Sequence, residues 1–355
     1  IIGFSAAEDW VDDSAPTRQR IEIENPTSTS FENVPVLVKI DSTAISSKEA
    51  IRFYAQGSTQ ELPFEVENWN AEGTSTVWVQ VPELAGNETA AIYGYYNGEK
   101  TQTSEQNVWN EEYVLVEHFS DNDFSQDSTG KTEGTVVGDL KTESSNMGMT
   151  GVFSGTQKIV YDPLLSAEKT FTIHAVIDPG QIDSWAGIVA RDLNGGKKEG
   201  DTFFLGISGK EMKYYGRFYG TTSTAPDVIY NYSRGYQLLT LSFDGTNLSL
   251  YLNGEKVVSN PASGVGEVSS SDATPLVVGA YSDTGSVVNP FFGNIDEVQI
   301  CTTPTSDDWE TFRYQNYSGT CVTTGPLESR DGGISLTVSA PADGAEIEAG
   351  TVTLS

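Results

Sequence analysis

The chain has few basic residues and no long apolar run. Its 355 residues include 20 Lys and Arg against 50 Asp and Glu, which gives a net charge of −30. Binding to nucleic acid or to anionic lipid depends on clustered Lys and Arg, so the charge argues against both classes of partner. No segment reaches the roughly 18 apolar residues of a membrane-spanning helix, so we expect no membrane insertion. Two compatible interpretations of the acidic residues remain, a solvated acidic surface and carboxylates that hold Ca²⁺.

Cysteine is nearly absent. Cys301 and Cys321 are the two cysteines, and no Cys-x-x-Cys or Cys/His cluster occurs, which argues against a structural zinc site. Their closeness in a loop-rich region predicts a disulfide that contributes roughly 3 kcal/mol, with two free thiols as the alternative. A disulfide implies an oxidising compartment, so we expect a secreted or cell-surface protein.

Common catalytic motifs are also missing. The sequence contains no His-Glu-x-x-His, no Gly-x-Ser-x-Gly and no Gly-rich phosphate loop. Its two histidines, His118 and His174, fall inside predicted strands, where packing explains them better than base catalysis. We therefore predict no catalytic residues and a protein that is not an enzyme.

Short strands separated by turn residues are abundant. With Gly 35 and 10% aromatic residues, the composition favours an all-β fold. The predicted strands of the first part are 20–24, 34–40, 51–54, 63–69, 76–81 and 90–96. Those of the second part are 113–119, 151–153, 159–161, 171–177, 186–190, 203–207, 214–219, 276–280 and one at Ile295. Asp244-Gly245 and Asn253-Gly254 are strong hairpin-turn signals inside 237–255.

The first part resembles the bacterial and archaeal extracellular module DUF2341. The resemblance rests on RIEIEN, NVPVLVKID, ELPFEVENWN, STVWVQVPEL and AAIYGYYNG, in this order. The second part resembles a laminin-G-like (LamG), concanavalin-A-like jelly roll through DSTGKTEGTV, FTIHAVIDPG, LSFDGTNLSLYLNGE, PLVVGAYS and FFGNIDEVQI. These resemblances imply a β-sandwich at 1–108 and a jelly roll at 109–325. We expect 326–355 to be a linker and the start of a truncated immunoglobulin-like repeat, within a longer chain of β modules.

A calcium site is implied by the second resemblance. Jelly rolls of this class often hold Ca²⁺ between an early loop and the last strand, which points to Asp127 and Asp296, with Thr132 adding a carbonyl. The spacing of Asp121, Asp123 and Asp127 superficially suggests an EF-hand loop that starts at Asp121. This interpretation is excluded because Gln126 and Thr132 stand at the sixth and twelfth positions, where that loop needs Gly and Glu.

Asp296 also stands out from the residues alone. Alternation places it on the same strand face as Val298 and Ile300, where a carboxylate must be paired, hydrogen-bonded or metal-bound. Acceptance of backbone N–H bonds at a strand end is therefore the alternative to calcium.

Aromatic residues and arginine gather in two segments of the second part. Trp185, Arg191 and Asp192 surround one loop, and alternation places Tyr215, Arg217 and Tyr219 on one strand face. Aromatic faces with nearby charged groups suit sugars, so we predict a ligand site from these six residues. Ordinary core and cross-strand packing is the alternative. The 281–290 loop is a further candidate for the rim.

The predicted function is the carbohydrate-binding region of a secreted or surface-anchored bacterial adhesin, stabilised by Ca²⁺ and monomeric within its longer chain. Its expected partner is a glycan or cell-surface polysaccharide. Two alternatives are a structural spacer or protein-binding module without a sugar site, and a targeting module of a polysaccharide-degrading enzyme.

Overall fold

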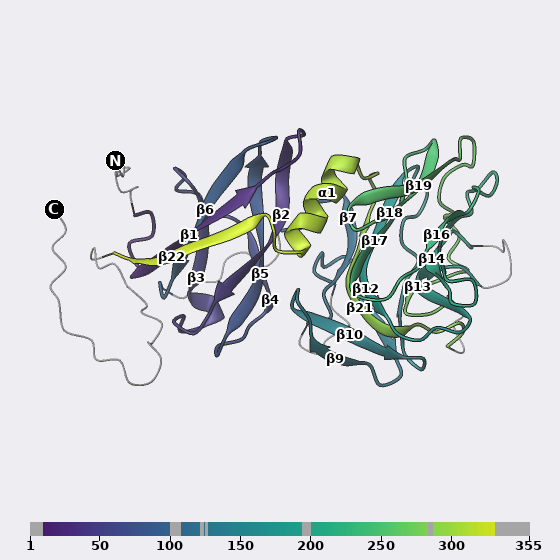
Figure 1. The fold of residues 1–355 in the computed structure, drawn as a ribbon, viewed down its shortest axis with the longest axis horizontal. Coiled ribbons are helices and arrows are strands. Elements are labelled where there is room, and N and C mark those ends of the chain that lie inside the picture. Colours follow the sequence, from purple (N-terminus) through teal and green to yellow (C-terminus); the bar gives the residue numbers. More distant parts are fainter. Residues whose placement is uncertain are drawn as a thin grey trace.

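The computed structural model describes residues 10–99, 108–120, 124, 127–193, 200–282 and 287–330. Its strands pair antiparallel in four sheets, which confirms the all-β fold class. The sheets form two sandwiches that lie side by side (Figure 1). Among the described residues, no helix is long and apolar enough to cross a bilayer.

The first sandwich packs a four-stranded sheet, in the order β22-β1-β6-β3, on a three-stranded sheet, in the order β2-β5-β4. Alternating apolar and polar residues decide which side chains of a strand face the core: Ile21 and Ile23 of β1 are buried while Glu22 and Glu24 are exposed. A short 3₁₀ turn, Lys48–Ala50, precedes β3. The strands that come from the first part of the chain are β1 (Thr17–Glu24), β2 (Phe31–Asp41), β3 (Ile51–Ala55), β4 (Phe64–Asn68), β5 (Thr74–Leu84) and β6 (Thr89–Tyr96).

The second sandwich is the jelly roll. Its strands are β7 (Tyr113–Glu117), β8 (Thr135–Val137), β9 (Lys141–Ser144), β10 (Met149–Ser154), β11 (Lys158–Tyr161), β12 (Phe171–Pro179), β13 (Trp185–Arg191), β14 (Phe203–Ser208), β15 (Lys213–Phe218), β16 (Val228–Asn231), β17 (Gln237–Phe243), β18 (Asn247–Leu252), β19 (Glu255–Pro261), β20 (Leu276–Val278) and β21 (Phe292–Cys301).

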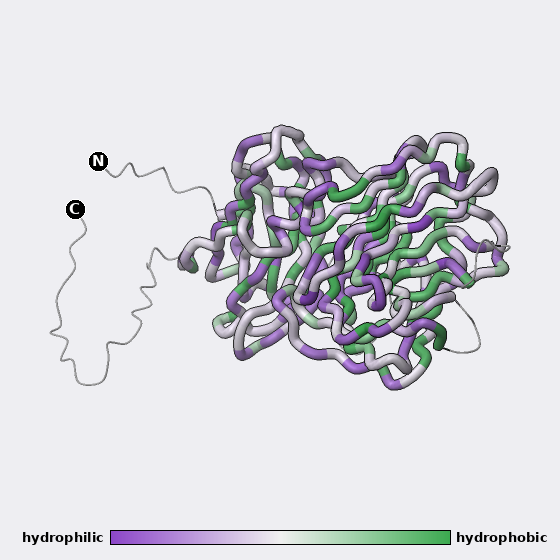
Figure 2. Tube along the Cα trace, turned by 45° about the vertical axis from the view of Figure 1, so that its right-hand side comes forward, coloured by the Kyte–Doolittle hydropathy of each residue, from purple (hydrophilic) through white to green (hydrophobic). Residues whose placement is uncertain are grey.

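Two sheets make up this jelly roll. The eight-stranded sheet runs β19-β18-β17-β12-β21-β10-β9, with β7 also paired to β21, and the seven-stranded sheet runs β16-β15-β14-β13-β20-β11-β8. One large hydrophobic cluster fills the space between them. Figure 2 shows hydrophobic segments along these strands and hydrophilic ones in many of the connecting loops. The predicted turn at Asn253-Gly254 joins β18 to β19, and both residues have positive φ (52° and 81°), as a tight hairpin turn requires.

After the jelly roll the chain returns to the first sandwich. Ser306 caps helix α1 (Asp307–Tyr317) by accepting the N–H of Trp309, and Asp307 and Asp308 lie in its first turn. Strand β22 (Val322–Ser329) then pairs with β1, from Ile23 opposite Val322 to Thr17 opposite Ser329. We expected the jelly roll to reach residue 325 and a linker to follow, but 322–329 complete the first sandwich. Alternation along β1 gave no sign that its partner lies at the other end of the chain.

The two sandwiches meet across a hydrophobic and aromatic layer. The outer face of the three-stranded sheet turns towards the outer face of the eight-stranded sheet, and α1 lies between the two sandwiches (Figure 1). The buried members of this layer are Leu37, Trp78, Val108, Trp109, Tyr113, Val116, Met147, Val176, Leu238, Cys301 and Tyr317. The molecule is therefore a stack of four β-sheets with one internal domain interface.

Candidate functional site

The structure brings together most of the residues predicted to bind a ligand. The rings of Trp185 and Tyr215 lie 4.7 Å apart between centroids, and those of Trp185 and Phe204 lie 6.0 Å apart. Phe204 stacks on Tyr281 at 4.6 Å. These side chains lie outside the jelly-roll core, because their strand neighbours Phe203 and Tyr214 face inward. We call Trp185, Phe204, Tyr215, Arg217, Tyr219 and Tyr281 the aromatic–arginine face; it covers part of the seven-stranded sheet.

Arg217 is the charged centre of this face. Its guanidinium makes a two-point contact with Asp227, with Nε–Oδ1 and Nη2–Oδ2 distances of 3.0 and 2.9 Å. Its Cζ lies 5.9 Å from the ring centre of Trp185 and 6.0 Å from that of Tyr219, and its Nη1 is 4.0 Å from Asp192 Oδ2. The hydrogen bond from Arg217 to Asp227 raises the pKa of Arg217. The predicted residues Asp192, Tyr215, Arg217 and Tyr219 thus form one connected group.

Arg191 does not belong to this group. It is fully buried and donates to the carbonyls of Thr274, Leu164, Ser269 and Ser271. Its side chain therefore holds the 269–274 segment against the sheet. Predicting it as a ligand residue was wrong because sequence proximity to Trp185 does not reveal which face of β13 a side chain occupies.

A groove adjoins the aromatic–arginine face. It has a volume of about 400 Å³ and is lined by residues 181–185 together with Asn289, Pro290 and Phe292. Trp185 belongs both to the groove and to the face, and its side chain is partly exposed. Part of the predicted rim, 283–286, lies outside the described residues. The surface thus combines a partly exposed indole with polar groups from the 181–184 loop.

The predicted calcium ligands are not assembled into one site. Asp127 Oδ1 accepts the N–H of Val116 at 2.6 Å, and Oδ2 accepts the hydroxyl of Thr129 and the N–H of Lys131. No contact within the described residues joins Asp127 or Thr132 to Asp296, while Asp121 and Asp123 lie outside them. With its oxygens engaged by three donors, Asp127 acts as a turn-forming residue, and this arrangement does not fit a calcium site shared with Asp296.

A β-bulge explains the position of Asp296. Two residues of β21, Glu297 and Val298, lie opposite the single residue Ala175 of β12, and Glu297 has a φ of 49°. The bulge shifts the alternation, so Val298 faces the jelly-roll core while Asp296 and Glu297 both face the first sandwich. The expected shared face of Asp296 with Val298 and Ile300 was therefore wrong. Asp296 lies within β21 rather than at a strand end, and it accepts hydrogen bonds from Ser145 Oγ at 2.8 Å and from the N–H of Glu297 at 2.9 Å.

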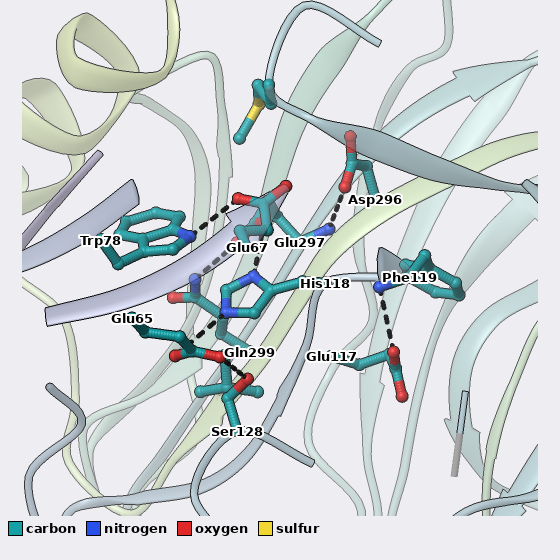
Figure 3. Close-up of polar contacts among 12 residues, drawn as sticks. Glu65, Glu67, Trp78, Glu117, His118, Phe119, Ser128, Asp296, Glu297 and Gln299 are labelled. Carbon is teal, nitrogen blue, oxygen red and sulfur yellow. Dashed lines mark hydrogen bonds and ion pairs between the residues drawn. The ribbon is translucent and has the colours of Figure 1, made fainter. Parts of the chain in front are cut away.

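A second group of polar residues lies at the domain interface (Figure 3). Glu67 of β4 in the first sandwich meets His118 and Glu297 of the jelly roll, and the ligand atoms of the three side chains lie within 4.8 Å of one another. Nδ1 of His118 is 2.7 Å from Glu297 Oε1, and Nε2 is 3.8 Å from Glu65 Oε2. We call Glu67, His118 and Glu297 the interface triad; all three are buried.

The surroundings of the triad are aromatic and polar. The ring of His118 lies 5.5 Å from the rings of both Trp78 and Trp109, which suits a positively charged imidazole. Burial alone would lower the pKa of His118, but the charge of Glu297, the hydrogen bond between Nδ1 and Glu297, and the nearby carboxylate of Glu65 raise that pKa well above the ordinary value. Burial and the charge of Glu297 raise the pKa of Glu67 well above the usual range of a carboxyl group.

Sequence reasoning missed this triad. Glu65 and Glu67 alternate with the apolar Phe64 and Val66, which is visible in the sequence but is also typical of a solvated strand face. His118 was predicted to be a packed residue, and the structure does bury it. Nothing in the sequence indicates that this face of β4 meets β21.

The predicted disulfide is absent. Cys301 and Cys321 are both free and buried. The Cys301 side chain packs in the layer between the sandwiches, whereas Cys321 packs in the core of the first sandwich. The prediction was wrong because α1 separates the two positions and directs them into different clusters.

Comparison with known proteins agrees with this architecture. Residues 153–309 match the family model Laminin_G_3 of the concanavalin A-like lectin/glucanases superfamily, and residues 47–133 match DUF2341, a domain of unknown function. No curated protein matches the chain.

Several solved structures are similar in fold. The binding domain of Paraclostridial Mosquitocidal Protein 1 is 12% identical with a TM-score of 0.48, covering 58% of this chain and 52% of that one. Domain 4 of AbnA, an extracellular GH43 arabinanase from Geobacillus stearothermophilus solved with arabinotriose, is 19% identical with a TM-score of 0.43, covering 56% and 97%. The binding domain of botulinum neurotoxin DC, solved with rat synaptotagmin II, is 14% identical with a TM-score of 0.46, covering 59% and 52%. This chain thus spans about half the length of the first and third of these structures. The family matches show that the chain joins a DUF2341 module to a laminin-G-type domain of the concanavalin A-like superfamily.

Proposed function

We propose that the chain is a carbohydrate-binding region of a secreted or cell-surface bacterial adhesin, and that it binds rather than transforms its ligand. The observation that carries the proposal is the aromatic–arginine face beside the groove at Trp185. Rings such as those of Trp185 and Tyr215 can stack on the C–H faces of a sugar, and Arg217 with Asp227 offers charged partners for hydroxyl groups. The concanavalin A-like family of the jelly roll supports the same class of ligand.

Trp185, Tyr215 and Arg217 are the partly exposed residues of the face and are available to a ligand, whereas Phe204, Tyr219 and Tyr281 are buried. The side chains of Arg217 and Asp227 are 21% and 28% exposed, so both can reach solvent while they remain paired. Their two-point contact fixes the direction of the guanidinium before a ligand arrives, which lowers the ordering cost of binding. Tyr215 is held in a similar way by its hydroxyl bond to Glu211.

Glycan-array binding with the wild-type chain tests the proposal. We expect Trp185→Ala and Arg217→Ala each to weaken binding about tenfold or more, equivalent to about 1.4 kcal/mol. Tyr314→Ala is the matched control, because Tyr314 is a similarly exposed aromatic residue that lies on α1 and away from the face. Circular dichroism of each variant checks that the fold is intact.

A broad array without any bound glycan would contradict the proposal. Capture of a protein partner that added sugars do not displace would support a protein-binding module instead. Equal losses in Trp185→Ala and Tyr314→Ala would place the ligand site elsewhere on the chain.

A further inference from the structure

Both carboxylates of the interface triad lie on irregular strand positions. Glu297 occupies the bulge of β21 with its positive φ, and Glu67 is the extra residue of β4 where its register with β5 shifts between Val66 and Asn68. β-Bulges redirect side chains and are common beside functional sites. Here the two bulges direct two carboxylates towards one imidazole from opposite sides of the domain interface (Figure 3).

Each carboxylate of the triad also has a separate hydrogen-bond partner for its Oε2 atom. Trp78 Nε1 donates to Glu67 Oε2 at 2.9 Å, and Gln299 Nε2 donates to Glu297 Oε2 at 2.9 Å. Glu65 lies on the Nε2 side of the His118 ring. Carboxylate–histidine pairs and hydrogen-bonded carboxylates of this kind orient the ligands of metal ions in proteins.

One oxygen of this group has no hydrogen-bond partner. Oε1 of Glu67 is buried and unpaired, although leaving a buried polar atom unsatisfied is costly. It packs against Gly148, where an added Cβ would lie 1.8 Å from that oxygen. The close approach of the backbone at Gly148 therefore closes the site from the side of the 145–148 loop.

We propose that the interface triad binds a divalent transition-metal ion of the Zn²⁺ class, with Glu67 supplied by the first sandwich and His118 and Glu297 by the jelly roll. One imidazole nitrogen and two carboxylates are a ligand set that Zn²⁺ accepts. The ion replaces the proton between His118 Nδ1 and Glu297 Oε1, so binding releases protons to solvent. Because its ligands come from both domains, the ion acts as a clamp between them.

Refolding the full chain with and without metal tests this site. After denaturation in EDTA and removal of the chelator, refolding with Zn²⁺ should yield one ion per chain by elemental analysis and a higher unfolding midpoint than refolding without metal. Co²⁺ in place of Zn²⁺ should give visible absorption bands of a nitrogen- and oxygen-ligated ion. Refolding lets the ion reach a site that is enclosed once the domains have docked.

Isosteric variants distinguish a bound metal ion from a proton that the triad shares. Glu67→Gln keeps the shape of the side chain but removes a ligand, so we expect it to fold, to lose the metal-dependent midpoint shift and to weaken Zn²⁺ binding at least about tenfold. The matched control is Glu117→Gln. Glu117 is equally buried but accepts from Phe119 N and Tyr161 Oη instead of facing the triad.

Three results would overturn the proposal. The first is a wild-type chain that refolds to the same midpoint with and without Zn²⁺ and retains no ion, which leaves protons as the neutralising species. The second is a metal-dependent shift that survives in Glu67→Gln. The third is a shift that disappears in Asp127→Asn instead, which assigns the ion to the turn at Asp127.

Discussion

The backbone N–H of Val116 donates to Oδ1 of Asp127 over 2.6 Å, which joins strand β7 to the turn that follows it. The other oxygen of Asp127 accepts from Thr129 and Lys131. Asp127 is almost completely buried, so its carboxylate replaces water for two backbone N–H groups and one hydroxyl.

This arrangement predicts that Asp127→Ala destabilises the jelly roll to the same extent without calcium, in about 5 mM EDTA, and with calcium, in about 5 mM Ca²⁺. The lost hydrogen bonds to a charged acceptor correspond to about 2–4 kcal/mol of unfolding free energy. Thermal and urea unfolding measure the effect. A calcium-dependent rise in the wild-type midpoint that Asp127→Ala or Asp296→Ala abolishes would support the calcium site predicted from the sequence.

Asn316 of α1 predicts a second effect on stability. Its side chain accepts the N–H of Leu37 at 2.8 Å and donates to the carbonyl of Leu37 at 3.0 Å, so it satisfies both backbone groups at the open edge of β2. Asn316→Ala would leave two buried groups unpaired at the domain interface, and we expect a loss of about 2–4 kcal/mol in the free energy of unfolding.

Urea unfolding of Asn316→Ala, followed by tryptophan fluorescence, measures this loss. The neighbouring Gln315→Ala is the control, since Gln315 is only partly buried and its side chain makes no hydrogen bond with β2 within the described residues. Equal stability of the two variants would show that water satisfies the edge of β2 equally well.

His174 predicts a pH dependence of stability. Burial, and then the positive charge of Arg313, lower its pKa well below the ordinary value of 6.5. Thr240 donates its hydroxyl to Glu310 Oε2 and lies 3.0 Å from His174 Nδ1, while Glu310 Oε1 is 3.5 Å from the same nitrogen. Because Thr240 already donates its proton, the neutral imidazole carries its proton on Nδ1 and donates it to Thr240.

The sign of this dependence follows from proton uptake. Below pH 6.5 the unfolded chain protonates His174 while the folded chain keeps it neutral, so the unfolded state binds more protons. The stabilisation is complete above pH 6.5 and decreases as the pH falls towards the folded-state pKa. Urea unfolding between pH 7.5 and about pH 5 should show a smaller decrease in His174→Gln than in the wild type. An identical decrease in both would rule out His174 as a source.

Because both cysteines are free and buried, we expect reducing agents to leave the stability of the protein unchanged. Burial raises the pKa of Cys301 to about 12 and that of Cys321 to about 11, so neither forms a reactive thiolate near neutral pH. We expect equal unfolding midpoints with and without dithiothreitol. Thiol titration should find two groups after unfolding and almost none before. A mass lower by two hydrogens, together with a midpoint that dithiothreitol reduces, would contradict the free thiols.

Strand positions were the part of the fold best predicted from the sequence. Alternation at Ile21–Ile23 and the turn at Asn253-Gly254 are local signals, and local residues alone produce those elements. The same alternation placed Tyr215 and Arg217 on one face, which the structure confirms. Asp296 was assigned to the wrong face because a single extra residue in a strand reverses the alternation, and no sequence rule marks the bulge at Glu297.

Long-range relationships could not be predicted. The pairing of β22 with β1, and the meeting of β4 with β21, depend on how complete sheets pack. Arg191 and Cys321 illustrate the same limit, since each lies close in sequence to a predicted partner while its side chain packs elsewhere.

The pairing of β1 with β22 has a mechanical consequence. Thr17, where the chain enters the first sandwich, lies opposite Ser329, where it leaves. A tensile load on the two flanking segments would pull the adjacent ends of these antiparallel strands apart and break their contacts one pair at a time, beginning at the Arg330–Asp13 ion pair and the hydrogen bond from Arg330 N–H to the carbonyl of Pro16. The jelly roll, which lies between these strands in the sequence, would carry no load until β22 had peeled away.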